Sequence, residues 1–85
     1  MEPDQQYLKT IVQGLVDFPD EVEVERGKDD MGILLTLKVN PQDMGKVIGR
    51  GGATINAIRP LLGIFGVIRK ARISVQVAEP EGNNY

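Results

Sequence analysis

The sequence contains no cysteine, no histidine and no tryptophan among its 85 residues. The lack of cysteine excludes thiolate nucleophiles and disulfides. The lack of histidine removes the imidazole base and, together with cysteine, the usual zinc ligands. The residues that remain indicate no cofactor and no metal site, and we expect that the chain is not an enzyme.

Long apolar runs and aromatic side chains are also scarce. The longest apolar runs are far short of the roughly 20 residues that a membrane-spanning helix needs, and the acidic N-terminal residues are not typical of a signal peptide. We expect a soluble, cytoplasmic protein that does not bind membranes. Its length predicts one domain over residues 1–85, with a core at about 5–78 and a flexible polar tail at 79–85. The aromatic residues are Tyr7, Phe18, Phe65 and Tyr85.

Acidic residues are absent from residues 44–78, although the whole chain has a net charge of −2. One half of the chain is therefore basic and the other acidic. The local potential, rather than the overall charge, decides what the basic half attracts. The basic residues of this stretch are Lys46, Arg50, Arg59, Arg69, Lys70 and Arg72.

Apolar periodicity in the first half of the chain predicts one helix followed by two strands. Apolar residues recur every three or four positions in the helix, which Pro19 should end. Strict alternation then places Val22 and Val24 on the inner face of the first strand. A short turn at 27–30 makes the two strands antiparallel. The predicted elements are a helix at 4–17, a strand at 21–25 and a strand at 32–39.

The second half predicts two helices and a third strand. Asn40 can cap a short helix, with Pro41 at its first position and Asp43 favouring the N-terminal dipole. Pro60 and nearby glycines should kink or fray the longer helix. The core stripe of this helix is predicted to be Ile55, Ile58, Leu62 and Phe65. The predicted elements are a helix from 41 to 48, a helix after residue 52 and a strand at 72–77.

The resulting order, αββααβ, predicts an α+β fold. The third strand follows the second through a helical crossover, which is the connection that parallel neighbours require. We therefore expect a mixed three-stranded sheet with three helices packed on one face.

A cluster of glycines between the two helices of the second half is where we expect the function to lie. Gly49, Gly51 and Gly52 surround the cation Arg50. Glycine permits sharp turns and leaves backbone N–H groups unshielded by a Cβ atom, so such a loop suits an anion. The first turn of the following helix adds unpaired N–H groups and the positive end of the helix dipole. A phosphate is the anion that this arrangement favours.

The residues around this loop resemble the KH family of RNA-binding domains, whose signature is Ile-Gly-x-x-Gly-x-x-Ile. In this chain the signature occupies residues 48–55. An extra helix and strand precede the core, which is similar to the type II, prokaryotic arrangement. The chain is short, and its segments at 20–24 and 41–49 resemble those of the small bacterial single-domain proteins of the KhpA family. The likeness covers residues 7–77, and it implies a type II KH fold.

The resemblance also implies binding of single-stranded RNA, with the 49–52 loop clamping the backbone of about four nucleotides. The loop chemistry agrees, because backbone N–H groups at Gly51, Gly52 and Ala53 would face a phosphate. Two positions depart from the family pattern: Gly51, which makes the loop more mobile, and Pro60 in the helix that follows. The RNA-binding residues that we expect are Gly49, Arg50, Gly51, Gly52, Lys46, Ala53 and Arg59.

Few aromatic side chains are available for base stacking, so we expect weak, salt-dependent binding with little sequence preference. A second site would raise the affinity through effective concentration. The resemblance implies a homodimer, or a heterodimer with a larger multidomain KH-containing RNA-binding protein, and a role as a low-specificity RNA chaperone or post-transcriptional regulator. The candidate pairing surface is the apolar end of the last helix, with Leu61, Leu62, Ile64 and Phe65.

Other functions fit parts of the pattern. A dinucleotide-binding enzyme is disfavoured because Thr54 stands where a third glycine is needed and no acidic residue follows at the ribose distance; a P-loop lacks its Gly-Lys-Ser/Thr. An enzyme using carboxylates lacks a partner base. The glycine loop alone also fits a simple turn between helices. A KH-fold protein-interaction adaptor with little or no RNA binding stays open, because a fold does not fix a function.

Overall fold

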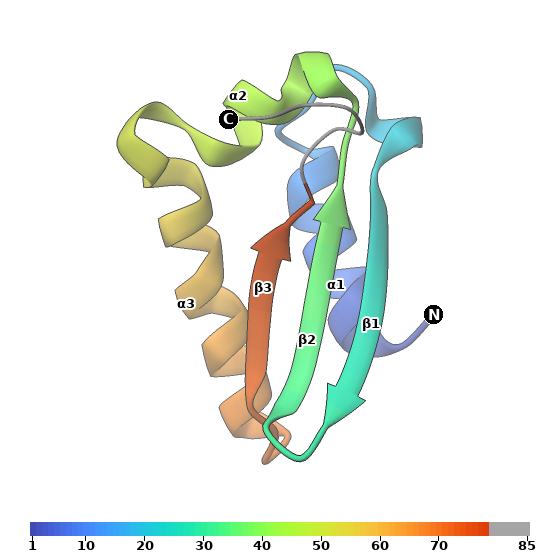
Figure 1. The fold of residues 1–85 in the computed structure, drawn as a ribbon, viewed down its shortest axis with the longest axis vertical. Helices are drawn as coiled ribbons and strands as arrows, with labels where there is room; N and C mark the ends of the chain where they lie inside the picture. Colours follow the sequence, from blue (N-terminus) through green and yellow to red (C-terminus); the bar gives the residue numbers. More distant parts are fainter. Residues whose placement is uncertain (79–85) are drawn as a thin grey trace.

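Three strands form one mixed sheet in a computed structural model that describes residues 1–78 (Figure 1). The strand β1 (Glu23–Asp29) pairs antiparallel with β2 (Gly32–Lys38), and β3 (Ile73–Val77) lies parallel to β2 on its other side. The helical crossover between β2 and β3 allows this parallel pairing. The predicted sheet is therefore confirmed, including the direction of each strand.

Helices cover one face of this sheet, in the order αββααβ that the sequence predicts. In Figure 1 α1 lies behind the strands, α3 descends beside β3, and α2 sits at the upper end of the molecule. The α+β class and the type II KH arrangement are both confirmed. The helices are α1 (Pro3–Gln13), α2 (Met44–Ile48) and α3 (Ala53–Ile68), with short 3-10 turns at Pro19–Glu21, Pro41–Asp43 and Arg50–Gly52.

The core lies between the sheet and the helices. Alternate residues of β2 point into it, so Leu35 and Leu37 are fully buried while Leu34 is exposed on the outer face. Val22 and Val24 are buried, as predicted. From the helices the core receives Leu8 and Val12 of α1, Val47 of α2, and Ile55, Ile58 and Leu62 of α3.

The boundaries of the first elements differ from those predicted. The helix α1 ends at Gln13 and is followed by Gly14, so it stops four residues before position 17. The strand β1 starts at Glu23 and continues through the expected turn to Asp29, and the reversal falls at Asp30 and Met31. The longer strand pairs fully with β2, which explains why residues 27–29 are extended.

Pro60 does not interrupt α3, which runs continuously from Ala53 to Ile68. The expected fraying is therefore wrong. Pro60 and Asn56 are both exposed, so water can bond the Asn56 carbonyl that has lost its intrahelical partner.

Asp43 has a different role from the one that its position at a helix start suggested. Asn40 caps the turn as predicted, since its side chain accepts a hydrogen bond from Gln42 N at 2.8 Å. The Asp43 side chain, however, is fully buried and accepts hydrogen bonds from the backbone N–H groups of Asp17 and Phe18, each at 3.0 Å. Asp43 thus attaches the segment after α1 to the start of α2.

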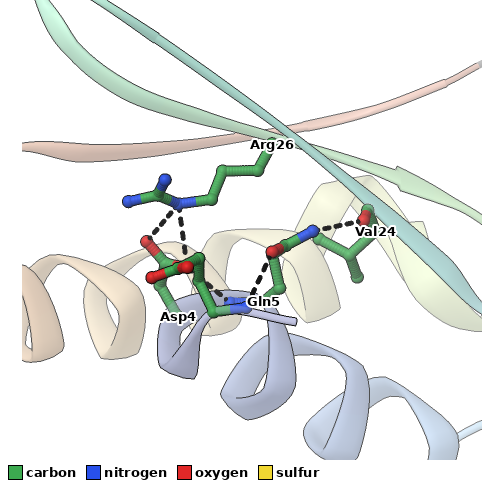
Figure 2. Close-up of polar contacts among 5 residues, drawn as sticks. Asp4, Gln5, Val24 and Arg26 are labelled. Atoms are coloured by element: carbon green, nitrogen blue, oxygen red, sulfur yellow. Dashed lines mark hydrogen bonds and ion pairs between the residues drawn. The ribbon is translucent and has the colours of Figure 1, made fainter.

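The start of α1 is attached to β1 by polar contacts (Figure 2). Arg26 Nε lies 3.0 Å from Asp4 Oδ2, and the Asp4 carboxylate is almost completely buried. Gln5 Nε2 donates a hydrogen bond to the carbonyl oxygen of Val24 at 2.9 Å. These contacts connect the first turn of the helix to the edge strand of the sheet.

By length and composition alone, the segment Arg50–Ile68 is long and apolar enough to cross a membrane. The expectation about uninterrupted apolar runs is unaffected, because Asn56, Arg59 and Pro60 interrupt this segment. The same segment contains the core residues Ile55, Ile58 and Leu62. A core helix passes the same length test, and packing on the sheet accounts for part of the apolar composition of α3, whereas other apolar residues of this helix are exposed.

Candidate nucleic-acid interface

The 49–52 loop connects α2 to α3 with three glycines in the left-handed region of backbone conformation. Gly49, Gly51 and Gly52 have φ values of 76°, 62° and 81°. A Cβ atom on Gly49 would lie 2.7 Å from the Thr54 backbone nitrogen, so this position admits no side chain. Gly51 has no neighbouring atom within 4 Å of such a Cβ and is exposed. The tip of the loop is therefore open to a ligand.

The backbone N–H groups of this loop are not arranged as predicted. Gly52 N donates to the Gly49 carbonyl oxygen at 3.2 Å, and Ala53 N donates to that of Arg50. The expectation that these two groups face a phosphate is wrong, because a 3-10 turn uses them. Within residues 1–78, Arg50 N and Gly51 N donate to no protein acceptor. Of the three amides expected to face a phosphate, only that of Gly51 stays available within the described residues, and that of Arg50 is available in addition.

Lys46 lies on α2, before the loop, and its ammonium group is held by carboxylates. Lys46 Nζ is 3.0 Å from Asp17 Oδ2 and 4.0 Å from Asp43 Oδ1. The hydrogen bond and the charge of Asp17 raise the pKa of Lys46 above its ordinary value of 10.5. Lys46 is therefore charged at neutral pH, but part of its charge is already compensated.

Arg50 and Arg59 are the other two cations of the predicted site. Arg50 is exposed at the loop tip and makes no ion pair within the described part of the chain. Arg59 lies further along α3, where its Nε donates to the Val75 carbonyl oxygen at 3.3 Å and its Nη1 donates to Asn56 Oδ1 at 3.3 Å. Arg59 thus spans the gap between α3 and β3.

The outer edge of β3 forms the second wall of the interface. Hydrogen bonds from Ile33 N to Arg72 O and from Ala78 N to Leu37 O fix the alternation of this parallel strand. The main-chain groups of Val75 consequently point away from β2, and Arg59 occupies one of them. No strand covers this edge within residues 1–78. The side of α3 that carries Arg59 therefore faces this edge, and we call the surface between them the groove. In Figure 1 α3 descends beside β3.

The sequence of this chain matches a known protein family over nearly its whole length. The family profile described as KhpA/KhpB, KH domain, matches residues 5–78. The chain belongs to the KhpA/KhpB KH-domain family. Among its curated relatives, the RNA-binding protein KhpA of Clostridium acetobutylicum is 44% identical over 72 residues, which cover 85% of this chain and 96% of that protein.

Two further members of the KhpA/KhpB family show how far the similarity extends. The RNA-binding protein KhpA of Caldanaerobacter subterraneus is 44% identical over 70 residues, or 82% of this chain and 93% of the relative. That of Chlamydia pneumoniae is 36% identical over 74 residues, or 87% of this chain and 95% of the relative. The likeness therefore extends over the whole fold and is not confined to the glycine loop.

Sequence reasoning missed two features of this KhpA/KhpB-type interface. Asp17 pairs with Lys46 from a distant part of the chain, and no local pattern indicates that contact. Asn56 orients Arg59, and here a signal was available, because side chains three residues apart on a helix are neighbours. Among residues 1–78 no cluster of acidic side chains is arranged to hold a metal ion.

The candidate pairing surface also changes in the structure. Leu62 is fully buried, and Phe65 stacks on Tyr7 with ring centroids 5.0 Å apart. These two residues are consequently unavailable to a partner. Four large apolar residues of α3 are exposed instead: Leu61, Ile64, Val67 and Ile68. Three of them share one side of the helix, and we call them the outer stripe: Leu61, Ile64 and Ile68.

Proposed function

We propose that this protein binds single-stranded RNA through the 49–52 loop and does not act as an enzyme. The observation that carries the proposal is that, within residues 1–78, the amides of Arg50 and Gly51 donate to no protein acceptor and the Arg50 guanidinium makes no ion pair. They lie at the start of α3, where the helix dipole favours an anion. The surrounding residues 44–78 contain no carboxylate that would repel a phosphate. The relatives called RNA-binding protein KhpA support the same ligand.

In the proposed mechanism one phosphate of the strand bonds the amides of Arg50 and Gly51, and Arg50 supplies the neutralising charge. The bases follow the groove between α3 and β3, where Arg59 and Asn56 offer polar groups. Gly49, Gly52 and Ala53 act by shaping the loop, and Lys46 adds to the local potential. Within residues 1–78 the one aromatic side chain of α3 and β3 is that of Phe65, which is stacked on Tyr7, so we expect weak affinity and low sequence preference.

Weak single-site binding fits a protein that works with a second RNA-binding site. We propose a homodimer, or a heterodimer with a larger multidomain KH-containing protein, paired through the outer stripe. Leu61, Ile64 and Ile68 are 40%, 59% and 71% exposed, and they lie on one side of α3. A second loop held by a dimer would raise the affinity through effective concentration. Such an assembly fits a cytoplasmic RNA chaperone or post-transcriptional regulator of low specificity.

The decisive experiment compares the wild type with an Arg50→Asp/Gly51→Asp double variant. Aspartate tolerates the left-handed conformation at position 51, so we expect the variant to fold, as checked by circular dichroism. Titration with short single-stranded RNAs at low and moderate salt should show that the variant loses at least about tenfold in affinity. Equal binding by the two proteins would exclude the loop from the mechanism.

A second function, a protein-interaction adaptor with little or no RNA binding, is favoured by one observation, the exposed outer stripe. Ile64→Asp places a charge at its centre without touching the loop. If the protein binds RNA in a dimer, this variant should sediment as a monomer and bind RNA more weakly. If the wild type dimerises but binds no RNA, the adaptor function is correct.

A further inference from the structure

A line of residues on α3 faces the open edge of β3 and extends well beyond the loop. Asn56, Arg59, Gly63 and Val67 are spaced by three or four positions, so they lie one above another on one side of the helix. The hydrogen bond from Arg59 to Val75 shows that this side faces β3. The groove therefore continues from the loop toward the C-terminal end of α3.

A recess of about 440 Å³ lies at the far end of this groove. Its position is set by the last turns of α3, the connection after it and the first residue of β3, which meet at the lower end of the molecule in Figure 1. The recess is open on its solvent side, so a ligand bound there would stay partly exposed. The residues that line the recess are Gly63, Val67, Lys70, Ala71, Arg72 and Ile73.

Gly63 is the residue that leaves the recess open. Glycine is a poor helix former, yet Gly63 lies in the interior of α3. A Cβ atom at this position would meet no other atom within 4 Å, so packing does not require a glycine. Gly66 is a useful contrast, because a Cβ there would lie 2.5 Å from the Ala71 carbonyl oxygen. The effect of Gly63 is thus on the shape of the groove and not on the packing of the helix.

The walls of the recess combine apolar surface with two cations. Val67 and Ile73 provide the apolar part. Lys70 and Arg72 are exposed at the rim, and neither makes an ion pair within residues 1–78. A nucleotide has the matching composition, with a flat base on one side and a phosphate on the other.

We propose that this recess binds a further nucleotide of the same RNA strand, beyond those held at the 49–52 loop. Its base lies against Val67 and Ile73 in the space above Gly63, and its phosphate is bound by Lys70 and Arg72. The inference rests on the proposed function. Eleven helical residues separate Gly52 from Gly63, a rise of about 17 Å. At about 3.4 Å per step of a stacked strand, this distance is about five nucleotide steps from the one bound at the loop, and a more extended strand covers it in fewer steps.

The test measures affinity against RNA length. Fluorescein-labelled oligouridylates of three to eight nucleotides are titrated by fluorescence anisotropy at low salt. For the wild type we expect a step of about tenfold in affinity when the strand becomes long enough to fill the recess, between four and six nucleotides. A smooth, small increase with length would contradict the proposal.

Two kinds of variant probe the recess itself. Gly63→Leu fills it and should remove the step while leaving the affinity for the shortest oligonucleotides unchanged; its helix content should not fall, because leucine is a good helix former. Lys70→Gln/Arg72→Gln should shrink the step and reduce the salt dependence by about 0.7 in log–log slope, because one phosphate contact is lost. Lys9→Gln/Lys38→Gln is the matched control, with the same change in net charge at two residues that do not line the recess.

The outcomes separate this proposal from the proposed function. If Gly63→Leu and the charge variant bind every length as the wild type does, the recess is not a nucleotide site, although RNA binding at the loop stands. If Arg50→Asp/Gly51→Asp has no effect at the shortest lengths, the loop mechanism fails. If the wild type binds no length at all, both proposals are refuted.

Discussion

Replacing Asp43 with alanine should destabilise the protein more than any surface substitution, because its buried carboxylate holds two distant backbone groups. Each oxygen accepts one N–H, from Asp17 and from Phe18, at 3.0 Å. A hydrogen bond to a charged group contributes about 1.5–3 kcal/mol, and a buried donor left without a partner costs about 1–3 kcal/mol. Water can reach part of this region, so we expect a loss of about 2–4 kcal/mol for Asp43→Ala.

A loss of that size is large for a chain of this length. A domain of 85 residues has a free energy of unfolding of about 4–13 kcal/mol. Urea titration followed by circular dichroism should therefore show a clearly lower midpoint, and the melting temperature should fall by at least about 10 °C. Asp43→Asn retains one acceptor oxygen and should lose about half as much stability.

The matched control for this prediction is Asp20→Ala. Asp20 is exposed, lies in the same connection after α1, and makes no side-chain hydrogen bond or ion pair within residues 1–78. Its removal should change the free energy of unfolding by no more than about 0.5 kcal/mol. If Asp43→Ala is as stable as Asp20→Ala, the carboxylate does not hold the segment and our reasoning about this contact is refuted.

Three further predictions concern the loop and the helix before it. Asp17→Asn should raise RNA affinity about twofold to fivefold, because it frees Lys46 from an exposed ion pair, and unchanged affinity in the same anisotropy titration would contradict this competition. Gly49→Ala should cost about 1–3 kcal/mol in urea unfolding because of its positive φ, whereas the unobstructed Gly45→Ala should not lower stability. The ion pair with Asp17 raises the pKa of Lys46 above 10.5. The ammonium group is therefore fully protonated well below pH 10.5, and the stability that its charge contributes is lost only as the pH rises through the raised pKa. RNA affinity should therefore be constant between about pH 7 and about pH 9, and a decrease across this range would show that another group titrates.

The parts of the fold that the sequence predicted are those that depend on local pattern. The alternation in β2 identifies its inner face because one side of the strand is buried and the other meets water. The capping role of Asn40 follows likewise from residue type and position. Such features require no knowledge of distant contacts.

The errors have a common physical origin in contacts between distant segments. The helix α1 ends early, and beyond its end the N–H groups of Asp17 and Phe18 bond Asp43, which lies 26 and 25 residues further along the chain. The ion pair between Lys46 and Asp17 is equally non-local. Neither partner carries a sequence signal for the other, so propensity and periodicity could not indicate these contacts.

The glycine loop was located correctly, but its hydrogen bonding was not. The same glycines allow either free amides or a tight 3-10 turn, and the choice depends on backbone angles that composition does not determine. The turn uses the amides of Gly52 and Ala53 and leaves those of Arg50 and Gly51. A ligand at this loop can therefore bond the amides of Arg50 and Gly51.

The aromatic stack at the opposite end of the molecule provides an optical reporter of folding. The ring of Tyr7 is stacked on Phe65 at an interplanar angle of 16°, and the guanidinium carbon of Arg69 lies 3.8 Å from the centroid of the Phe65 ring. The chain contains two tyrosines and no tryptophan, so near-ultraviolet dichroism and tyrosine fluorescence are sensitive to this contact between α1 and α3. The stack lies away from the glycine loop, and its signal distinguishes a variant that has lost its ligand from one that has lost its tertiary structure.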